Sequence, residues 1–377
     1  MKTTKTLFIL GIILCLLIPF TTIAQWSQNT IQHDGIQRQY WIYVSPNYDA
    51  NTPASLIVTL HGMGDDATNF RGINFNDVAD TANVIILVPD ALVDDLTGMT
   101  AWNSSAGVDL IGVSYYPNSN INDVDFINTI VNETIANYSI EATKTYVCGF
   151  SMGGFMTQKL ALEANSPFAA FASVAGTFGS GLTISNPGRT IPIAHFHGTE
   201  DGTVGYDNNM FGSNVQDLVD FWVDNNNCDA TPIHTFLPDN YQDGFTVEHF
   251  LYDNGDNNTV VELFKVNNAG HIWLHEGVHD ISYTGEIWNF FNRHTHQNLS
   301  IDEEKKYDFT IYPNPTSGVV TIKSDYAHTQ KISIKDLNGK EVYNGDMNGI
   351  TQIDVSALTV GLYFVEIGNT VQKIVVQ

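Results

Sequence analysis

The segment GFSMGG at residues 149–154 places one serine, Ser151, between glycines. A serine hydroxyl is a weak nucleophile, so it attacks a carbonyl group only when a neighbouring base takes its proton. The G-x-S-x-G spacing is typical of a sharp turn from a strand into a helix, where glycines admit close backbone approach and the serine oxygen stands above a sheet. The apolar residues 145–150 before the turn and the helix-like residues after it fit this context. We therefore expect Ser151 to be a catalytic nucleophile.

Two later segments supply a candidate acid and a candidate base. The segment HFHGTEDGTVGY, residues 195–206, puts Asp201 in a turn after an apolar run. The segment NNAGHIW, residues 267–273, puts His271 in a loop before a helix-like run. A histidine can take the serine proton while a carboxylate orients its ring, and the chain order Ser, Asp, His is that of α/β-hydrolases. Glu200 remains an alternative to Asp201 as the acid.

An oxyanion-binding loop is expected at residues 60–66, LHGMGDD, which close an early strand. Backbone N–H groups that are fixed in advance stabilise the charge of a tetrahedral intermediate. We predict that the backbone amides of Met63 and Met152 form this oxyanion hole, and that the ring of His61 is tied to the backbone of its own loop. This chemistry requires no metal and no organic cofactor.

Several other histidine and acidic residues are expected to have structural rather than catalytic roles. His195 and His197 straddle a strand end and are expected in the core, while Asp123 and Asp125 fit the cap and first turn of a helix. Residues 275–279 spell H-E-x-x-H, a zinc-protease pattern that needs both histidines on one stable helix. The glycine at its centre weakens a helix by about 1 kcal/mol relative to alanine. We therefore expect a surface loop there.

Short apolar runs alternate with helix-like segments from residue 38 onward. Continuous apolar runs of this length suit strands that are covered on both faces, and their alternation with helices predicts a mostly parallel sheet with crossover helices. The expected strands are residues 40–45, 55–62, 84–90, 145–150, 169–176 and 192–198, and the expected helices are residues 122–138, the stretch after 151, 215–225 and 286–294.

The composition changes after this α/β unit, which we expect to span residues 25–297. Residues 298–308 are polar and charged, as in a linker. Residues 309–377 contain short alternating runs separated by Asn-Gly, Ser-Gly and proline signals. This pattern predicts a small all-β sandwich.

The chain has 377 residues and a formal net charge of −25. Lys2 and Lys5 precede an apolar stretch, so residues 1–24 predict a cleavable signal peptide, and the stretch is short for a membrane span. The negative charge repels phosphate backbones and anionic membranes, which argues against nucleic-acid binding. Cys148 and Cys228 remain after cleavage, and the sequence fits either one disulfide or two thiols.

Residues 35–295 resemble the secreted esterase family of poly(3-hydroxybutyrate) depolymerases and feruloyl or acetylxylan esterases. The segments that carry the resemblance include LHGMGDDATNF, YVCGFSMGGFMTQKLALEANSPFAAFASVAGT, FHGTEDGTVGY and AGHIWL. The resemblance implies that the serine, aspartate and histidine named above form the catalytic triad. It also implies that Trp102 and Trp273 line the substrate pocket.

The tail, residues 309–377, resembles the type A C-terminal sorting domain of the type IX secretion system of Bacteroidetes. The matching segments are YPNPTSG, DLNGKEVY, IDVSALTVGLYFV and KIVVQ. The resemblance implies recognition by an outer-membrane translocon, followed by release or attachment at the cell surface. A carbohydrate-binding sandwich is the alternative for this tail, with tyrosine side chains as a sugar platform.

These features predict a secreted serine carboxylic-ester hydrolase acting on feruloyl or acetyl esters of plant polysaccharide. Met63 stands where the depolymerases usually carry cysteine, and Leu274 stands where they often carry proline. Both differences weaken the assignment to a polyester substrate, which remains the alternative. A prolyl-oligopeptidase-type peptidase shares the triad order but normally carries a large extra domain. A surface-displayed binding protein that kept the scaffold is the non-enzymatic alternative.

Overall fold

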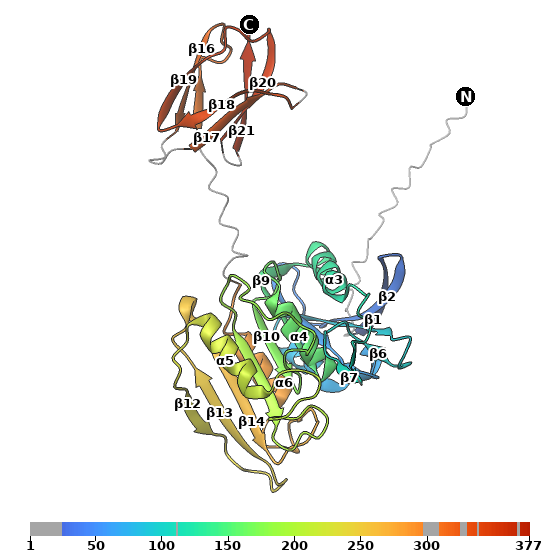
Figure 1. Cartoon of the computed structure of the whole chain (residues 1–377). Helices are drawn as coiled ribbons and strands as arrows, with labels where there is room; N and C mark the ends of the chain where they lie inside the picture. Colours follow the sequence, from blue (N-terminus) through green and yellow to red (C-terminus); the bar gives the residue numbers. More distant parts are fainter. Residues whose placement is uncertain (1–24, 111, 297–308, 325–329, 338, 368–369) are drawn as a thin grey trace, which may run out of the picture. The chain divides into compact units, whose positions relative to one another are not determined.

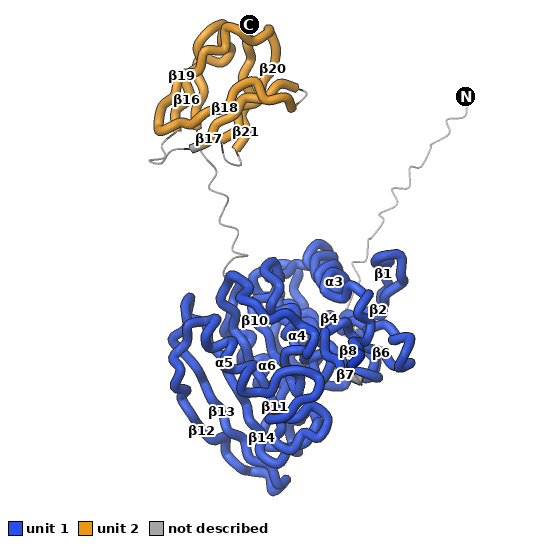
Figure 2. Tube along the Cα trace, viewed as in Figure 1, with its two compact units in different colours: residues 1–297 blue, residues 298–377 orange. Residues whose placement is uncertain are grey.

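The structure is a computed structural model that describes residues 25–377 except residues 111, 297–308, 325–329, 338 and 368–369. The expected signal peptide and linker therefore lie outside the described residues. The chain separates into two compact units, and the division falls between Gln297 and Asn298 (Figure 2). Of the helices that the structure describes, none has the length and apolar character needed to cross a membrane.

The first unit is built on a ten-stranded, mostly parallel sheet in the order β1-β2-β4-β3-β9-β10-β11-β14-β13-β12 (Figure 1). Neighbours from β4 to β14 pair in parallel, and the pairs at both edges are antiparallel. The strands are β1 Gln25–His33, β2 Ile36–Val44, β3 Ala54–Leu60, β4 Val84–Pro89, β9 Ile140–Phe150, β10 Ala170–Val174, β11 Ile193–Gly198, β12 Ile233–Phe236, β13 Thr246–Tyr252 and β14 Val261–Asn267.

The burial of the central strands explains why the sequence predicted them correctly. Every residue of β3, β4, β10 and β11 is buried, as expected for strands covered on both faces. The six expected strands and the mostly parallel sheet are confirmed. Four strands of this sheet were not predicted: β1 and β12 at its edges, and β13 and β14 inside it. Their sequences mix polar and apolar residues; all four residues of β12 are exposed, whereas β14 is mostly buried although it contains Glu262 and Lys265.

Helices cover both faces of the sheet (Figure 1). Side chains of α3, α4 and α5, such as Phe126, Met156 and Trp222, pack on one face. Side chains of α1, α2 and α6, such as Phe75 and Phe290, pack on the other. The helices are α1 Ala67–Phe70, α2 Phe75–Thr81, α3 Asp123–Asn137, α4 Met152–Leu162, α5 Val215–Asn226 and α6 Tyr283–Phe291, with 3-10 turns at Arg71–Ile73 and Asp256–Asn258.

The start of α3 contains a buried ion pair that the sequence did not reveal. Asn122 is the cap, and its side chain accepts a hydrogen bond from the amide of Asp125, which confirms the first turn but moves the cap by one residue. Asp123 is 1% exposed, and its Oδ1 lies 2.7 Å from Nη2 of Arg38. Its Oδ2 accepts a hydrogen bond from the amide of Asn103 at 2.7 Å. Asp123 therefore joins the helix start to β2 and to the backbone of Asn103.

Two short antiparallel ribbons lie in the connection between β4 and α3. They pair β5 Leu92–Val93 with β6 Thr100–Ala101, and β7 Val108–Leu110 with β8 Val113–Tyr115. These ribbons matter because their residues form much of the pocket described below.

The second unit is an all-β structure of two antiparallel sheets, β15-β16-β19 and β18-β17-β20-β21. Its core includes Val320, Ile334 and Val365. Tyr363 is 5% exposed, and its hydroxyl donates to the carbonyl of Thr359 at 2.8 Å, so this tyrosine belongs to the core and is not an exposed sugar platform. The strands are β15 Phe309–Tyr312, β16 Val319–Ser324, β17 Gln330–Lys335, β18 Glu341–Met347, β19 Ile350–Asp354, β20 Gly361–Ile367 and β21 Thr370–Val376.

Candidate active site

Ser151 occupies a strained turn between β9 and α4, with φ 55° and ψ −119°. A non-glycine residue in such a conformation costs about 1–3 kcal/mol, a strain found most often at functional sites. Close packing of the backbone explains the flanking glycines. A Cβ added to Gly149 would lie 2.2 Å from the carbonyl oxygen of Gly153, and one added to Gly153 would lie 2.0 Å from that of Leu60. Neither position can carry a side chain while the turn keeps this shape.

Asp201 and His271 meet beside this turn. Asp201 follows β11 and His271 follows the neighbouring parallel strand β14, and Nδ1 of His271 lies 2.7 Å from Oδ2 of Asp201. The other carboxylate oxygen of Asp201 accepts hydrogen bonds from the amides of Thr203 at 2.9 Å and Val204 at 2.8 Å. Of the two candidate acids, Asp201 and Glu200, it is Asp201 whose carboxylate hydrogen-bonds the imidazole.

The electrostatics of Asp201 keep it charged. Burial by itself would raise the pKa of this carboxyl, but the hydrogen bond and positive character of His271, with the two backbone amides, outweigh burial and hold the pKa below its usual value. The side chain of Asp201 has 0% exposure, whereas that of His271 is 18% exposed. The imidazole therefore has a buried side toward the carboxylate and a side open to a substrate.

His271 also lies close to the serine turn. The ring centroids of His271 and Phe150, the residue before Ser151, are 4.8 Å apart. Within the described residues no hydrogen bond joins Ser151 Oγ to the imidazole; such contacts are often longer before a substrate binds.

The expected oxyanion loop packs against the nucleophile. A Cβ added to Gly62 would lie 3.3 Å from Cβ of Ser151. Nδ1 of His61 lies 2.7 Å from the carbonyl oxygen of Gly62, and its Nε2 accepts a hydrogen bond from the amide of Ala91 at 3.0 Å. Burial lowers the pKa of His61, which suits a neutral ring with these two partners. His61 is thus tied to its own loop, as expected.

The two tryptophans predicted to line the pocket are placed differently. Trp102 has 0% exposure, and its Nε1 donates to the carbonyl of His61 at 2.9 Å. Trp273 is 9% exposed, its Nε1 donates to Oγ1 of Thr284 at 3.2 Å, and its ring meets that of Phe150 edge-on. In this structure both indoles support the loops behind the site, because their surfaces are covered by protein.

A cavity of about 270 Å³ lies beside both predicted oxyanion residues, Met63 and Met152. Its other walls are mainly apolar and include Leu96, Val108 and Phe211. None of these three was predicted as a site residue. They come from loops and short ribbons whose sequences carry no periodic signal, so only their position in the fold reveals them.

Asp94 organises one wall of this cavity. It accepts hydrogen bonds from the amide of Thr97 at 2.9 Å, from the amide of Asn118 at 3.1 Å and from the hydroxyl of Tyr115, which itself lines the cavity. Burial would raise the pKa of Asp94, but these hydrogen bonds hold it at about 2. The charged carboxylate therefore ties the β5–β6 ribbon to the β7–β8 ribbon.

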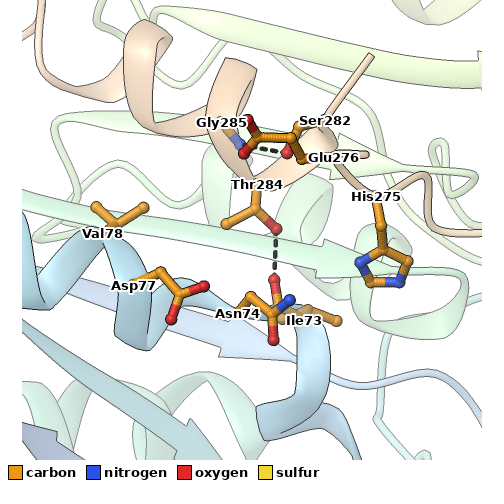
Figure 3. A pocket seen from close by; sticks show the side chains of 9 residues that line it. All are labelled: Ile73, Asn74, Asp77, Val78, His275, Glu276, Ser282, Thr284 and Gly285. Atoms are coloured by element: carbon orange, nitrogen blue, oxygen red, sulfur yellow. Dashed lines mark hydrogen bonds between the residues drawn. The ribbon is translucent and has the colours of Figure 1, made fainter. Parts of the chain in front are cut away.

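The H-E-x-x-H segment is not a zinc-binding helix. Residues 275–279 form a turn in which Gly277 has φ 83°, and Nδ1 of His279 lies 2.9 Å from Oδ2 of Asp243. His275 and Glu276 instead line a polar cavity of about 360 Å³ that also borders α2 (Figure 3). Among the residues described, no three or more His, Cys, Asp and Glu side chains are grouped to hold a metal ion.

The two cysteines do not form a disulfide in this structure. Cys148 is buried in β9, Cys228 is partly buried after α5, and both are free. Burial raises the pKa of the Cys148 thiol and raises that of Cys228 to about 11, so neither is a thiolate near neutral pH.

The sheet order, the strained turn at Ser151 and the acid and base on later strand ends define an α/β-hydrolase. Residues 47–250 match the phospholipase/carboxylesterase family, and the chain belongs to this family. Residues 310–377 match the secretion system C-terminal sorting domain, which confirms the assignment of the tail. The family resemblance of the first unit, as well as that of the tail, is thus confirmed.

Similar proteins include several esterases. The chain is 29% identical over 179 residues to a bifunctional acetylxylan esterase/xylanase of Neocallimastix patriciarum, covering 46% of this chain and 23% of that protein. It is 26% identical over 198 residues to a probable feruloyl esterase C of Aspergillus niger, covering 52% of this chain and 64% of that protein. The chain thus spans less than two thirds of these relatives. An acetyl xylan esterase structure from Aspergillus awamori superposes with a TM-score of 0.51 at 15% identity, over 71% of this chain and 99% of that one, which shows a shared fold.

Proposed function

We propose that this chain is a secreted serine carboxylic-ester hydrolase that works through an acyl-enzyme. The observation that carries the proposal is the Asp201–His271 hydrogen bond at the sheet edge that also holds the strained turn of Ser151. A base that is oriented by a buried carboxylate beside a partly exposed serine is the arrangement that activates a hydroxyl for acyl transfer.

The first half of the reaction forms the acyl-enzyme. Nε2 of His271 takes the proton of Ser151 Oγ as the oxygen attacks the ester carbonyl carbon. The backbone amides of Met63 and Met152 bind the oxyanion, and the N-terminus of α4 adds its positive dipole. The imidazolium, stabilised by Asp201, then gives the proton to the departing alkoxide oxygen as the C–O bond breaks.

The second half releases the acid. His271 takes a proton from a water molecule as the water oxygen attacks the acyl carbon, and the same amides hold the second oxyanion. The proton then passes to Ser151 Oγ as the acyl bond breaks. The carboxylic acid leaves and the free serine is restored. Each step uses groups of this chain, the ester and water.

The cavity beside Met63 and Met152 is proposed to hold the acyl group. Its volume of about 270 Å³ and its apolar walls suit an aromatic acyl group such as feruloyl, whereas an acetyl group would fill little of it. The similarity to feruloyl and acetylxylan esterases supports esters of plant polysaccharide as the substrate class.

A polyester depolymerase is the second candidate. Leu96, Val113 and Met210 are 72%, 68% and 70% exposed, and each lies on or next to a segment that lines the cavity. Exposed apolar side chains around a site can contact an insoluble apolar polymer.

The sorting domain indicates export through a secretion system. We propose that it carries the hydrolase unit through the type IX translocon, to be released or attached at the cell surface. Deleting residues 309–377 in a host that has this system should trap active esterase inside the cell envelope. Normal export of the shortened chain would reject this role for the tail.

The proposed activity is tested with a substrate panel. Wild type and Ser151→Ala are compared on p-nitrophenyl acetate, p-nitrophenyl butyrate, methyl ferulate, feruloylated arabinoxylan, acetylxylan and polyhydroxybutyrate. We expect ester turnover in the wild type and only background in Ser151→Ala, with feruloyl esters turned over best. Equal rates in the two proteins would end the esterase proposal, and polymer turnover confined to polyhydroxybutyrate would favour the second candidate.

A further inference from the structure

A chain of buried hydrogen bonds crosses the first unit beneath the site. Nε1 of Trp222 on α5 donates to Oε1 of Gln158 on α4 at 2.8 Å, and Nε2 of Gln158 donates to Oγ of Ser173 on β10 at 2.8 Å. Oγ of Ser173 lies 2.7 Å from Nδ1 of His195, and Nε2 of His195 lies 3.0 Å from Nδ1 of His197. The five side chains have exposures of 0–1%. Water therefore does not compete for these hydrogen bonds.

The chain of hydrogen bonds ends at the carbonyl oxygen of Val204, next to the carboxylate that orients His271. Nε2 of His197 lies 2.7 Å from the carbonyl oxygen of Val204 and 3.5 Å from Oδ2 of Asp201. The amide of the same residue, Val204, donates to Oδ1 of Asp201 at 2.8 Å. One residue of the turn thus links His197 to Asp201, through its carbonyl on one side and its amide on the other.

The direction of every bond follows from the acceptor at the end. A carbonyl oxygen only accepts, so Nε2 of His197 carries a hydrogen and its Nδ1 accepts from Nε2 of His195. Nδ1 of His195 then accepts from the hydroxyl of Ser173, which in turn accepts from Gln158. Burial lowers the pKa of both histidines, in agreement with two neutral rings. All donors point toward Asp201, and aligned hydrogen bonds polarise one another.

We propose that this chain holds the Asp201 turn in place, and that His197 is a positioning residue for the hydrolysis. The inference rests on the proposed function. The hydrogen on Nε2 of His197 holds the carbonyl of Val204, whose amide donates to Asp201, so it limits how far Asp201 can move from His271. A displacement of about 1 Å at such a contact lowers a rate by about a hundredfold.

The test compares two changes at one position. His197→Phe keeps a buried ring but removes the donor and the acceptor, whereas His197→Gln keeps one of each. His197→Phe should lower kcat on p-nitrophenyl acetate by about ten- to a hundredfold with little change in KM, because the acyl-transfer geometry is affected more than binding. His197→Gln should keep most of the kcat that His197→Phe loses. The matched control is His249→Phe on β13, whose partner is Glu262, and it should keep the wild-type kcat.

A second readout separates positioning from stability. The pH profile of kcat/KM reports the ionisations of the free enzyme, and the groups that face His197 are His195, Asp201, Tyr206 and His271. His197→Phe should shift the acidic limb of this profile, and His197→Gln should return it toward wild type. A merely structural role would lower the melting temperature and leave the profile of the folded enzyme unchanged.

Three outcomes would overturn the inference. They are a folded His197→Phe with wild-type kcat, a His197→Gln variant as impaired as His197→Phe, and an unshifted pH profile in a folded His197→Phe. If His197→Phe does not fold, Ser173→Ala breaks the same chain two links away and should lower kcat by a smaller factor; an unchanged kcat there is equally decisive. The proposed function fails separately, through a wild type without ester turnover or a Ser151→Ala variant with full activity.

Discussion

Nδ1 of His271 lies 2.7 Å from Oδ2 of Asp201, although the two residues are 70 positions apart in the chain. They meet because β11 and β14 are parallel neighbours, and the carboxyl ends of such strands lie along one edge of a sheet. The carboxylate is fully covered while part of the imidazole is open. This geometry orients the ring from one side and leaves the other side free to act on Ser151.

The identity of the acid can be tested with a matched pair of neighbours. Asp201→Asn should lower kcat on p-nitrophenyl acetate by about 10³–10⁴-fold, since an amide no longer stabilises the imidazolium or the required tautomer. Glu200→Gln should change kcat little, because the imidazole hydrogen-bonds Asp201 instead. Steady-state kinetics of both purified variants decide the point. A larger loss in Glu200→Gln would reverse the assignment.

The acyl pocket can be tested by filling it. Val108→Phe adds volume to the wall of the cavity of about 270 Å³ and should lower kcat/KM for methyl ferulate at least about tenfold, while p-nitrophenyl acetate is affected little. The small acyl group needs less of the cavity than the aromatic one. Leu337→Phe, an exposed position in the second unit, controls for added aromatic surface. Equal losses on both esters would place the acyl group elsewhere.

The Arg38–Asp123 ion pair is expected to be important for stability. Both side chains are 1% exposed and joined at 2.7 Å. Removing one partner leaves a buried, unpaired charge, so Asp123→Ala should lower the free energy of unfolding by about 3–5 kcal/mol. Chemical denaturation monitored by tryptophan fluorescence measures the change. Arg38→Met combined with Asp123→Leu should recover part of the loss, and a single mutant as stable as wild type would contradict this account.

Stability should decline as the pH falls below the ordinary pKa of histidine. Burial, with a smaller effect of Arg293, lowers the pKa of His294 to about 4, and burial also lowers that of His195. The unfolded chain then binds more protons than the folded chain below about pH 6.5, so each such residue removes about 1.4 kcal/mol per pH unit until its folded pKa is reached. The stability is fully present above that range.

Unfolding experiments at pH 8, 6 and 5 check this expectation. His294→Gln should make the decline shallower, because one fewer proton is taken up on unfolding. The exposed position Thr235, whose side chain does not titrate, provides the control, since Thr235→Gln should leave the slope unchanged. A free energy of unfolding that stays constant from pH 8 to pH 5 would contradict the prediction.

Local sequence was sufficient for the elements whose residues share one environment. The wholly buried strands β3 and β4 read as continuous apolar runs, and the GFSMGG segment predicted a strand, a turn and a helix in that order. It was insufficient for β12, because this edge strand lacks a covered face and therefore a continuous apolar signal, and for β13 and β14, whose apolar residues are interrupted by charged ones. It also did not predict the ion pair of Asp123 with Arg38, since the sequence of a helix start is the same whether its carboxylate contacts water or a buried arginine.

Composition and local spacing were enough to predict the residue types that can do chemistry, their order along the chain and the two-part organisation. The fold was needed to show that Asp201 rather than Glu200 meets His271, and that Trp102 and Trp273 lie behind the site. Only the fold brought His195 and His197 into a hydrogen-bonded chain that ends at Val204, the residue whose amide holds Asp201. Such contacts depend on strand register and loop packing, which join residues far apart in the chain and leave no local pattern.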